Sequence, residues 1–242
     1  MKRILMYGGG LQTTAMAVLV KQSKLLIDEA IFSDTGGEKP ETYWYMENYI
    51  KQIFHEAGVP FRLVRNELPS CQPDLYGWLW KYGQIPPIGG KRLCSVKFKT
   101  EAIERYLKPQ AYDTLIGFSF DEMSRARTSD KIKPKIYPLI DMKMTAGDCH
   151  SLITSYGLPV PLKSSCFFCP FQHPTEWNWL KNNHSDLFTR ALELEANYHK
   201  RRPDMADFGL VRGVPLRKLK DGIQPEMFAD IGYSCWSGYC SH

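Results

Sequence analysis

Short apolar runs alternate with amphipathic stretches along most of the chain. Apolar runs that suit buried strands lie at residues 4–7, within 25–38, and at 60–66, 112–116 and 135–141. Stretches with helical spacing begin at Gln12 and cover residues 40–58, 94–107 and 145–157. Pro40 suits a first helical turn, and Gly58 and Gly157 each lie where a helix ends. This alternation predicts an α/β fold with an open, mostly parallel sheet and helices on both faces.

The pattern changes near residue 160. A loop rich in proline and cysteine is followed by two helical stretches, residues 174–183 and 185–202. We therefore predict a sheet domain over residues 1–160 and a mainly helical, Cys-containing C-terminal appendage over 161–242, packed on the first. Residues 68–93 are irregular and rich in aromatic residues, which suit either stacking on a base or packing the loop onto the core. These aromatic residues include Trp78, Trp80 and Tyr82.

Composition narrows the class of protein. The 242 residues are 43% hydrophobic and 24% charged, as in ordinary globular proteins. No apolar stretch approaches the ~20 residues that span a bilayer, and the first apolar run is too short for a signal peptide, so we expect a cytoplasmic protein that does not enter a membrane. The net charge of +5 permits an anionic ligand but does not require nucleic acid.

Three glycines, Gly8–Gly10, separate the first predicted strand from the first helix in "RILMYGGGLQTTAMAVL". Glycine lets the backbone approach a ligand closely, and a helix start offers free N–H groups to a phosphate. The stretch fits neither the P-loop, which needs Lys followed by Ser or Thr, nor the G-x-G-x-x-G fingerprint. From these residues alone, a tight turn without a ligand is an equally good interpretation.

Polar residues follow other predicted strands. Asp34 and Glu38 in "SDTGGE" suit Mg²⁺ or a ribose hydroxyl, or else belong to an ordinary polar loop that caps the next helix. Arg125 and Arg127 in "DEMSRAR" suit bidentate phosphate binding, or else a solvated loop. Because parallel strands end at the same edge of a sheet, we expect the glycines and Asp34–Glu38 to face one crevice.

The seven cysteines point to metal or thiol chemistry more than to disulfides, since their number is odd and we expect a reducing compartment. "CFFCP" is a C-x₂-C pair, Cys166 and Cys169, typical of zinc, iron–sulfur and redox sites. Cys94, with Cys235 or Cys240 as a fourth ligand, would complete an iron–sulfur site, and zinc is the alternative metal. Cys71 and Cys149 are interpreted as isolated thiols.

Several stretches, in order, resemble the phosphoadenosine phosphosulfate (PAPS) reductase family of the PP-loop, adenine nucleotide alpha-hydrolase-like superfamily. They are "YGGGLQTTA", "FSDTGGEKPETYWY" (32–45), "GFSFDEMSRAR", "YPLID" and "CFFCPF". The resemblance covers roughly residues 3 to 170 and makes residues 1–160 a PP-loop nucleotide-binding domain. It implies that the nucleotide is held by Gly8, Gly9, Gly10, Gln12, Thr13, Thr14, Asp34, Thr35, Gly36, Arg125 and Arg127.

The chain departs from the family pattern at two places. Gly8 stands where the PP-loop usually has its first serine, and Thr13 or Thr14 replaces its last serine. The terminal "GYCSH" contains Cys240 but lacks the Glu and Gly of the E-C-G-[LI]-H tail of sulfonucleotide reductases.

The resemblance implies three functions. The first is sulfur transfer through ATP-dependent adenylation, with Mg²⁺ or the nucleotide positioned by Asp34 and phosphate charge neutralised by Arg125 and Arg127. An iron–sulfur cluster, expected as 4Fe–4S, would be held by Cys94, Cys166 and Cys169 with a tail cysteine. The acceptor would be tRNA or DNA, a sulfur or electron donor protein would assist, and a homodimer fits this class. The second is a PAPS/APS reductase with Cys240 as nucleophile, and the third is a non-catalytic nucleotide- or zinc-binding partner.

Overall fold

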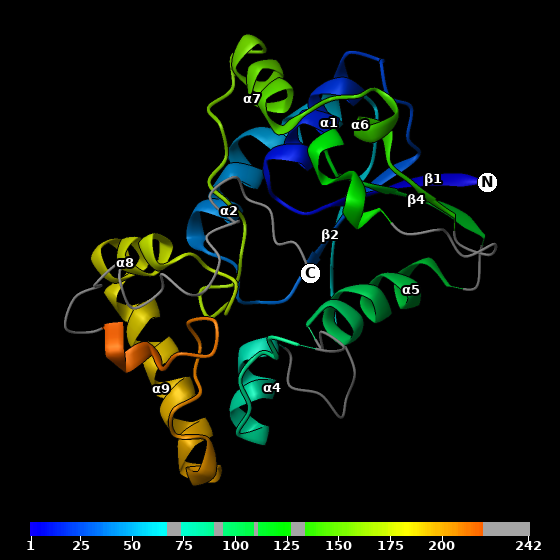
Figure 1. Ribbon diagram of the computed structural model, residues 1–242. Helices are drawn as coiled ribbons and strands as arrows, with labels where there is room; N and C mark the ends of the chain where they lie inside the picture. Colours follow the sequence, from blue (N-terminus) through cyan, green and yellow to red (C-terminus); the bar gives the residue numbers. More distant parts are fainter. Residues whose placement is uncertain (67–73, 90–93, 109–110, 127–133, 220–242) are drawn as a thin grey trace.

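Five parallel strands form the centre of the fold (Figure 1). The computed structural model describes residues 1–66, 74–89, 94–108, 111–126 and 134–219. The strands are β1 (Lys2–Tyr7), β2 (Glu29–Asp34), β3 (Phe61–Arg65), β4 (Tyr112–Ile116) and β5 (Lys135–Ile136). Their order is β3-β2-β1-β4-β5, and each neighbouring pair is parallel. The predicted α/β class with a mostly parallel sheet is confirmed.

Helices cover both faces of the sheet, as predicted. The helices that follow the first strands are α1 (Leu11–Lys21), α2 (Pro40–Tyr45), α3 (Lys51–Glu56), α4 (Leu75–Tyr82), α5 (Glu101–Leu107), α6 (Pro138–Asp141) and α7 (Ala146–Ser155). Side chains of β1 point alternately to the two faces. Leu5 and Tyr7 belong to a core shared with α1, α3 and α7, whereas Ile4 packs in a core with Ile103 of α5.

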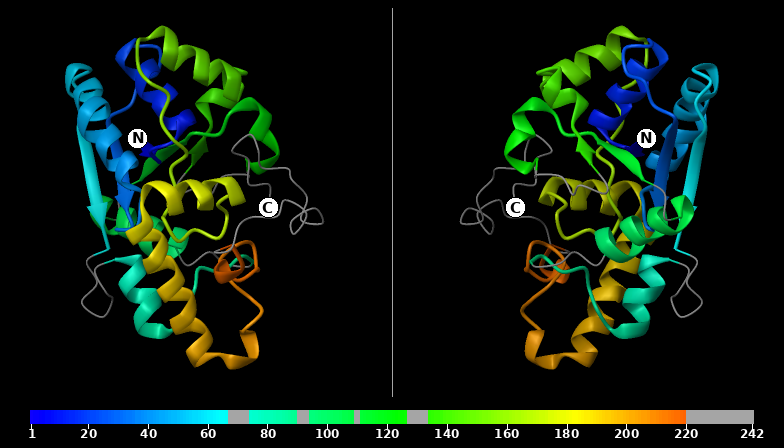
Figure 2. Two further views of the ribbon diagram at one scale, coloured as in Figure 1. Left: turned by 90° about the vertical axis from the view of Figure 1, so that its left-hand side faces the viewer. Right: turned by 90° about the vertical axis from the view of Figure 1, so that its right-hand side faces the viewer.

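The C-terminal helices α8 (Pro174–Asn183) and α9 (Ser185–Arg201) form a second core together with α4. Figures 1 and 2 show α4 beside α9, away from the sheet, and the Asn197 amide of α9 donates a hydrogen bond to the carbonyl of Trp80 at 2.8 Å. This core joins Leu79 to Trp177 and Leu194. This core therefore contains residues from both sides of residue 160. The division into two domains at that residue stays a prediction.

Some element predictions were wrong. Residues 75–82, expected to be irregular, form α4, because Asp74 caps the helix through the Gly77 N–H at 2.6 Å and Trp78 is buried in the second core. The strand expected over 135–141 ends at Ile136, since Pro138 has no N–H for a strand ladder and begins α6 instead.

Two of the predicted helices contain π-helical turns. The helix over residues 40–56 is continuous but changes to a π-helix at Met46–Ile50, and the helix at Cys94 begins as a π-helix, Cys94–Thr100. No helix in the described part of the chain is long and apolar enough to cross a membrane.

Candidate functional site

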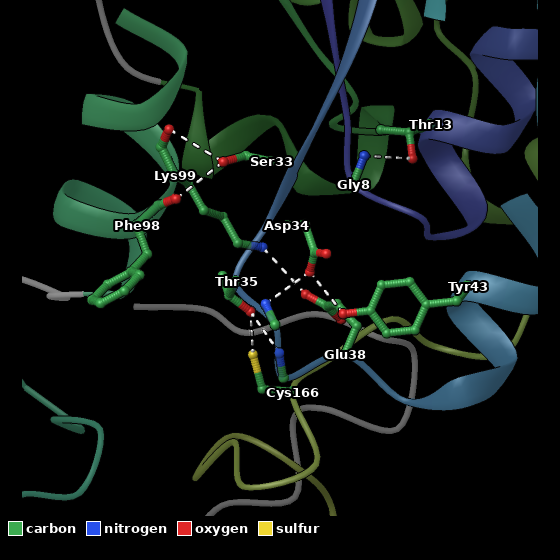
Figure 3. Close-up of polar contacts among 12 residues, drawn as sticks. Gly8, Thr13, Ser33, Asp34, Thr35, Glu38, Tyr43, Phe98, Lys99 and Cys166 are labelled. Atoms are coloured by element: carbon green, nitrogen blue, oxygen red, sulfur yellow. Dashed lines mark hydrogen bonds and ion pairs between the residues drawn. The ribbon is translucent and has the colours of Figure 1, made fainter. Parts of the chain in front are cut away.

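The glycine turn after β1 has a conformation that requires glycine. Gly9 has a φ of +76°, and a Cβ there would lie 2.8 Å from Cγ2 of Thr42. The Thr13 hydroxyl accepts a hydrogen bond from the Gly8 N–H at 3.2 Å (Figure 3). It also donates a hydrogen bond to the Gly10 carbonyl at 3.2 Å. The turn is thus braced by the first residues of α1.

The turn lies at the point where the strand order reverses. The chain proceeds from β1 to β2 on one side and returns to β4 on the other, which is where open parallel sheets bind ligands. The loop after β4 packs closely against the start of α1. A Cβ on Gly117 would lie only 2.7 Å from Cγ2 of Thr13. The carboxyl ends of β1 and β4 therefore form one edge of the candidate site.

Glu122 organises this edge. Its carboxylate accepts a hydrogen bond from the Gln12 amide at 3.1 Å and forms an ion pair with Arg125. The Arg125 guanidinium lies 4.4 Å from the ring centre of Phe118. Gln12 and Arg125, both predicted site residues, are thus brought together by one carboxylate. Thr14 is instead buried in the interior, where its hydroxyl lies 3.3 Å from that of Tyr7.

Asp34, at the end of β2, is buried and has donors on both oxygens. Oδ1 accepts hydrogen bonds from the Gly36 N–H and the Tyr43 hydroxyl, each at 2.7 Å (Figure 3). Oδ2 accepts from two guanidinium nitrogens of Arg65, at 2.8 and 2.6 Å. Burial raises the pKa of Tyr43 well above its usual range, and Asp34 raises it further, so this hydroxyl stays a donor.

A pocket of about 480 Å³ lies beside these groups. Gly36, Tyr43, Arg65 and Asp74 line it, so the predicted residue Gly36 contributes to its wall. The volume falls within the range of small-molecule sites. A planar or anionic group of a ligand would find the guanidinium and the phenol hydroxyl already oriented by Asp34.

Cys166 lies against the loop that follows β2. Its sulfur is 3.1 Å from the Thr35 hydroxyl (Figure 3). The next residue, Phe167, donates its N–H to the Gly37 carbonyl at 2.8 Å. Glu38 pairs with Cys166 as an antiparallel β-bridge. Burial raises the pKa of the Cys166 thiol well above its ordinary value, and the neighbouring Glu38 carboxylate raises it further.

Lys99 connects Glu38 to the cysteines. Its ammonium lies 3.7 Å from the Glu38 carboxylate and within electrostatic reach of Cys94, Cys166 and Cys169. Cys94 and Cys166 also pack against the same apolar core, the one formed by α4, α8 and α9. Thiolates suit iron, yet no group of three His, Cys, Asp or Glu side chains in the described ranges is arranged to hold a metal. The metal site stays a prediction. Cys71, Arg127, Cys235 and Cys240 lie outside the described residues.

Several residues of this site were not predicted. Arg65 and Lys99 are brought to it by strand order and by a long connection, and no local pattern marks them. Tyr43 lies within "FSDTGGEKPETYWY", although its role as a donor to Asp34 depends on the fold. Ser164, whose hydroxyl oxygen lies 3.3 Å from where a Cβ on Gly10 would stand, is brought there by a long connection. Glu122 could have been noticed as the acidic residue of "GFSFDEMSRAR", although its role as the partner of Gln12 depends on the pairing of β1 with β4.

Comparisons with known proteins add little. No family model and no curated protein matches this chain. Among solved structures, the chain is similar to the U34-tRNA thiolase NcsA from Methanococcus maripaludis with its 4Fe–4S cluster. The two share 15% identity at a TM-score of 0.40, over 93% of this chain and 73% of that chain. A likeness this distant carries no argument about this protein.

Proposed function

We propose that this protein is a PP-loop enzyme that binds an adenine nucleotide at Gly8–Gly10 and uses it to activate an acceptor for sulfur transfer. One observation carries the proposal: a single extended segment lies against both the glycine turn and the end of β2. Ser164 lies 3.3–3.4 Å from where Cβ atoms on Gly9 and Gly10 would stand, and the Cys166 sulfur lies 3.1 Å from the Thr35 hydroxyl. The segment that carries the Cys166 thiol therefore also lies against the turn that would hold the phosphates.

The electrostatics of the turn favour an anion. The first N–H groups of α1 have no partner within the helix and lie at its positive dipole end. Nearby, Lys39 and Lys163 share one carboxylate, that of Glu176, at 3.6 and 2.9 Å. This cluster of three side chains has more positive than negative charge. Both features support the binding of phosphate on this side of the sheet.

In the proposed reaction an acceptor oxygen attacks the α-phosphorus of ATP, the bond to the β-phosphate breaks, and pyrophosphate leaves with Mg²⁺. A sulfur nucleophile at the hydrosulfide level then displaces AMP from the activated acceptor. Arg125 neutralises phosphate charge. Asp34, whose oxygens already have donors, acts by holding Tyr43 and Arg65 at the pocket.

The sulfur source in this proposal lies at the cysteines. Cys94, Cys166 and Cys169 are the residues that would hold an iron–sulfur cluster, which would supply bound sulfur when present. The acceptor is tRNA or DNA. The adenylation step does not depend on the cluster, so adenylation and cluster binding are tested separately.

Product analysis tests the proposal. Anaerobically purified protein is incubated with labelled ATP, with and without RNA or DNA, and separately with PAPS. Formation of AMP and pyrophosphate that increases with nucleic acid is the expected result. Sulfite from PAPS without use of ATP would instead favour the reductase alternative and Cys240. Absence of both products would favour a non-catalytic partner.

Two cysteine variants separate sulfur delivery from adenylation. Cys166→Ser is expected to abolish the thiolated product while pyrophosphate still forms, because AMP leaves only when sulfur displaces it from the acceptor. Cys149→Ser is the matched control, because Cys149 is buried in the core shared with α1 and lies outside this site. Equal losses of thiolated product in the two variants would contradict a role for Cys166. Iron content and the visible absorption of the purified protein report on the cluster independently of turnover.

A further inference from the structure

The segment that carries Cys166 lies directly over the glycine turn. The Cβ of Ser164 is 3.4 Å from the place where a Cβ on Gly9 would stand, and its hydroxyl oxygen is 3.3 Å from the corresponding place on Gly10. A Cβ on Gly10 would crowd the Ser164 hydroxyl, whereas a Cβ on Gly9 would meet Ser164 at an ordinary van der Waals distance. The Ser164 hydroxyl thus lies in the space that a ligand of the turn would share.

The Ser164 hydroxyl makes no hydrogen bond to any residue that the structure describes, and the side chain is half-buried. A hydroxyl that lies between backbone segments normally has a hydrogen-bond partner, because a missing hydrogen bond costs free energy. A free donor above a turn built for an anion is therefore available to a phosphate oxygen.

The geometry of the segment links this hydroxyl to the thiol. Cys166 is in an extended bridge with Glu38, and side chains two residues apart in an extended chain point to the same side. Ser164 and Cys166 accordingly both face the ends of the strands, Ser164 at β1 and Cys166 at β2. Ser165 has its hydroxyl oxygen buried, also without a hydrogen-bond partner among the described residues.

We propose that Ser164 donates a hydrogen bond to a phosphate oxygen of the nucleotide and so fastens the Cys166 segment to the occupied turn. This inference rests on the proposed function, since it needs a nucleotide at Gly8–Gly10. It adds a binding residue from the C-terminal part of the chain.

Binding of ATP, inorganic pyrophosphate and adenosine to three variants tests the inference. Ser164→Ala should weaken binding of ATP and pyrophosphate about tenfold, because a hydrogen bond to a charged group is lost, and should leave adenosine binding unchanged. Ser164→Thr keeps a hydroxyl donor and should restore phosphate binding to within about threefold of the wild type. Ser165→Ala is the matched control, and its affinities should stay within about twofold of the wild type.

The outcomes separate the two proposals. If the wild type binds ATP and pyrophosphate and Ser164→Ala binds them equally well, the inference is wrong and the proposed function stands. If Ser164→Ala weakens adenosine binding as much as ATP binding, the serine has no specific phosphate role, and the inference is again wrong. If the wild type binds neither ATP nor pyrophosphate, both proposals are overturned. Thermal unfolding of each variant shows that the compared proteins are folded.

Discussion

Arg65 places two guanidinium nitrogens on one carboxylate oxygen of Asp34, at 2.8 and 2.6 Å. The arginine ends β3 and the aspartate ends β2, so the contact ties together the ends of two neighbouring strands. Asp34 is buried, whereas 57% of the Arg65 side chain is exposed. This ion pair therefore holds the Arg65 guanidinium at the rim of the pocket and gives the buried Asp34 carboxylate a partner.

Removal of this guanidinium should destabilise the fold. Arg65→Ala leaves one oxygen of the buried Asp34 carboxylate without its donors, and we expect the free energy of unfolding to fall by about 1–3 kcal/mol. Urea unfolding followed by circular dichroism measures the change. Arg62→Ala is a matched control, because Arg62 lies on the same strand with 58% of its side chain exposed and stands 3.8 Å from Glu29. That control should change stability by less than about 0.5 kcal/mol. Equal effects would contradict the structural role of the Asp34 pair.

Gly8 and Gly9 of the glycine turn should differ in how well they tolerate substitution by alanine. Gly9→Ala introduces a Cβ at a φ of +76° and 2.8 Å from Thr42, so we expect a loss of about 1–2 kcal/mol from the backbone alone and a further loss from the clash. Gly8→Ala meets its nearest side chain only at 3.9 Å and should be tolerated. Thermal unfolding and ATP affinity of the two variants provide the comparison. A Gly9→Ala protein as stable as Gly8→Ala would show that the turn has another conformation.

Glu195 should be essential to the last part of the C-terminal core. This buried carboxylate accepts hydrogen bonds from the backbone N–H groups of Leu210 and Leu216, each at 2.8 Å. Glu195→Ala leaves both donors unpaired in the interior, and we expect a loss of about 3 kcal/mol in stability. Glu193→Ala, on the exposed side of α9, should cost less than about 0.5 kcal/mol. Indistinguishable denaturation midpoints for the two variants would refute this role of Glu195.

Cys149 should resist alkylation in the native protein. Burial raises the pKa of its thiol to about 12, and the side chain is inaccessible to solvent. Because the thiolate is the reactive form, labelling by iodoacetamide should stay slow up to about pH 9 and proceed only after denaturation. Peptide mapping by mass spectrometry measures the labelled fraction. Rapid native labelling of Cys149 at about pH 8 would show that α7 does not pack as the structure has it.

Local patterns in the sequence determined the sheet, its covering helices and the glycine turn. The alternation of apolar runs and helical stretches is enough to predict parallel strands, because each strand and helix is specified by neighbouring residues. Gly9 illustrates the same point for the site, since a run of three glycines between a strand and a helix is by itself typical of a close backbone approach. The C-x₂-C spacing likewise made Cys166 a candidate metal ligand, and that role stays a prediction.

The tertiary structure decided which of these residues meet and what supports them. Strand order set β3 beside β2 and so brought Arg65 to Asp34, and the pairing of β4 with β1 brought Glu122 to Gln12. The path of a long connection placed Ser164 over Gly9 and Gly10. The helix at Leu75–Tyr82 likewise depends on burial of its apolar face against α9. Such contacts join residues far apart in the chain, and local propensity contains no information on which distant segments will share a sheet edge or a core.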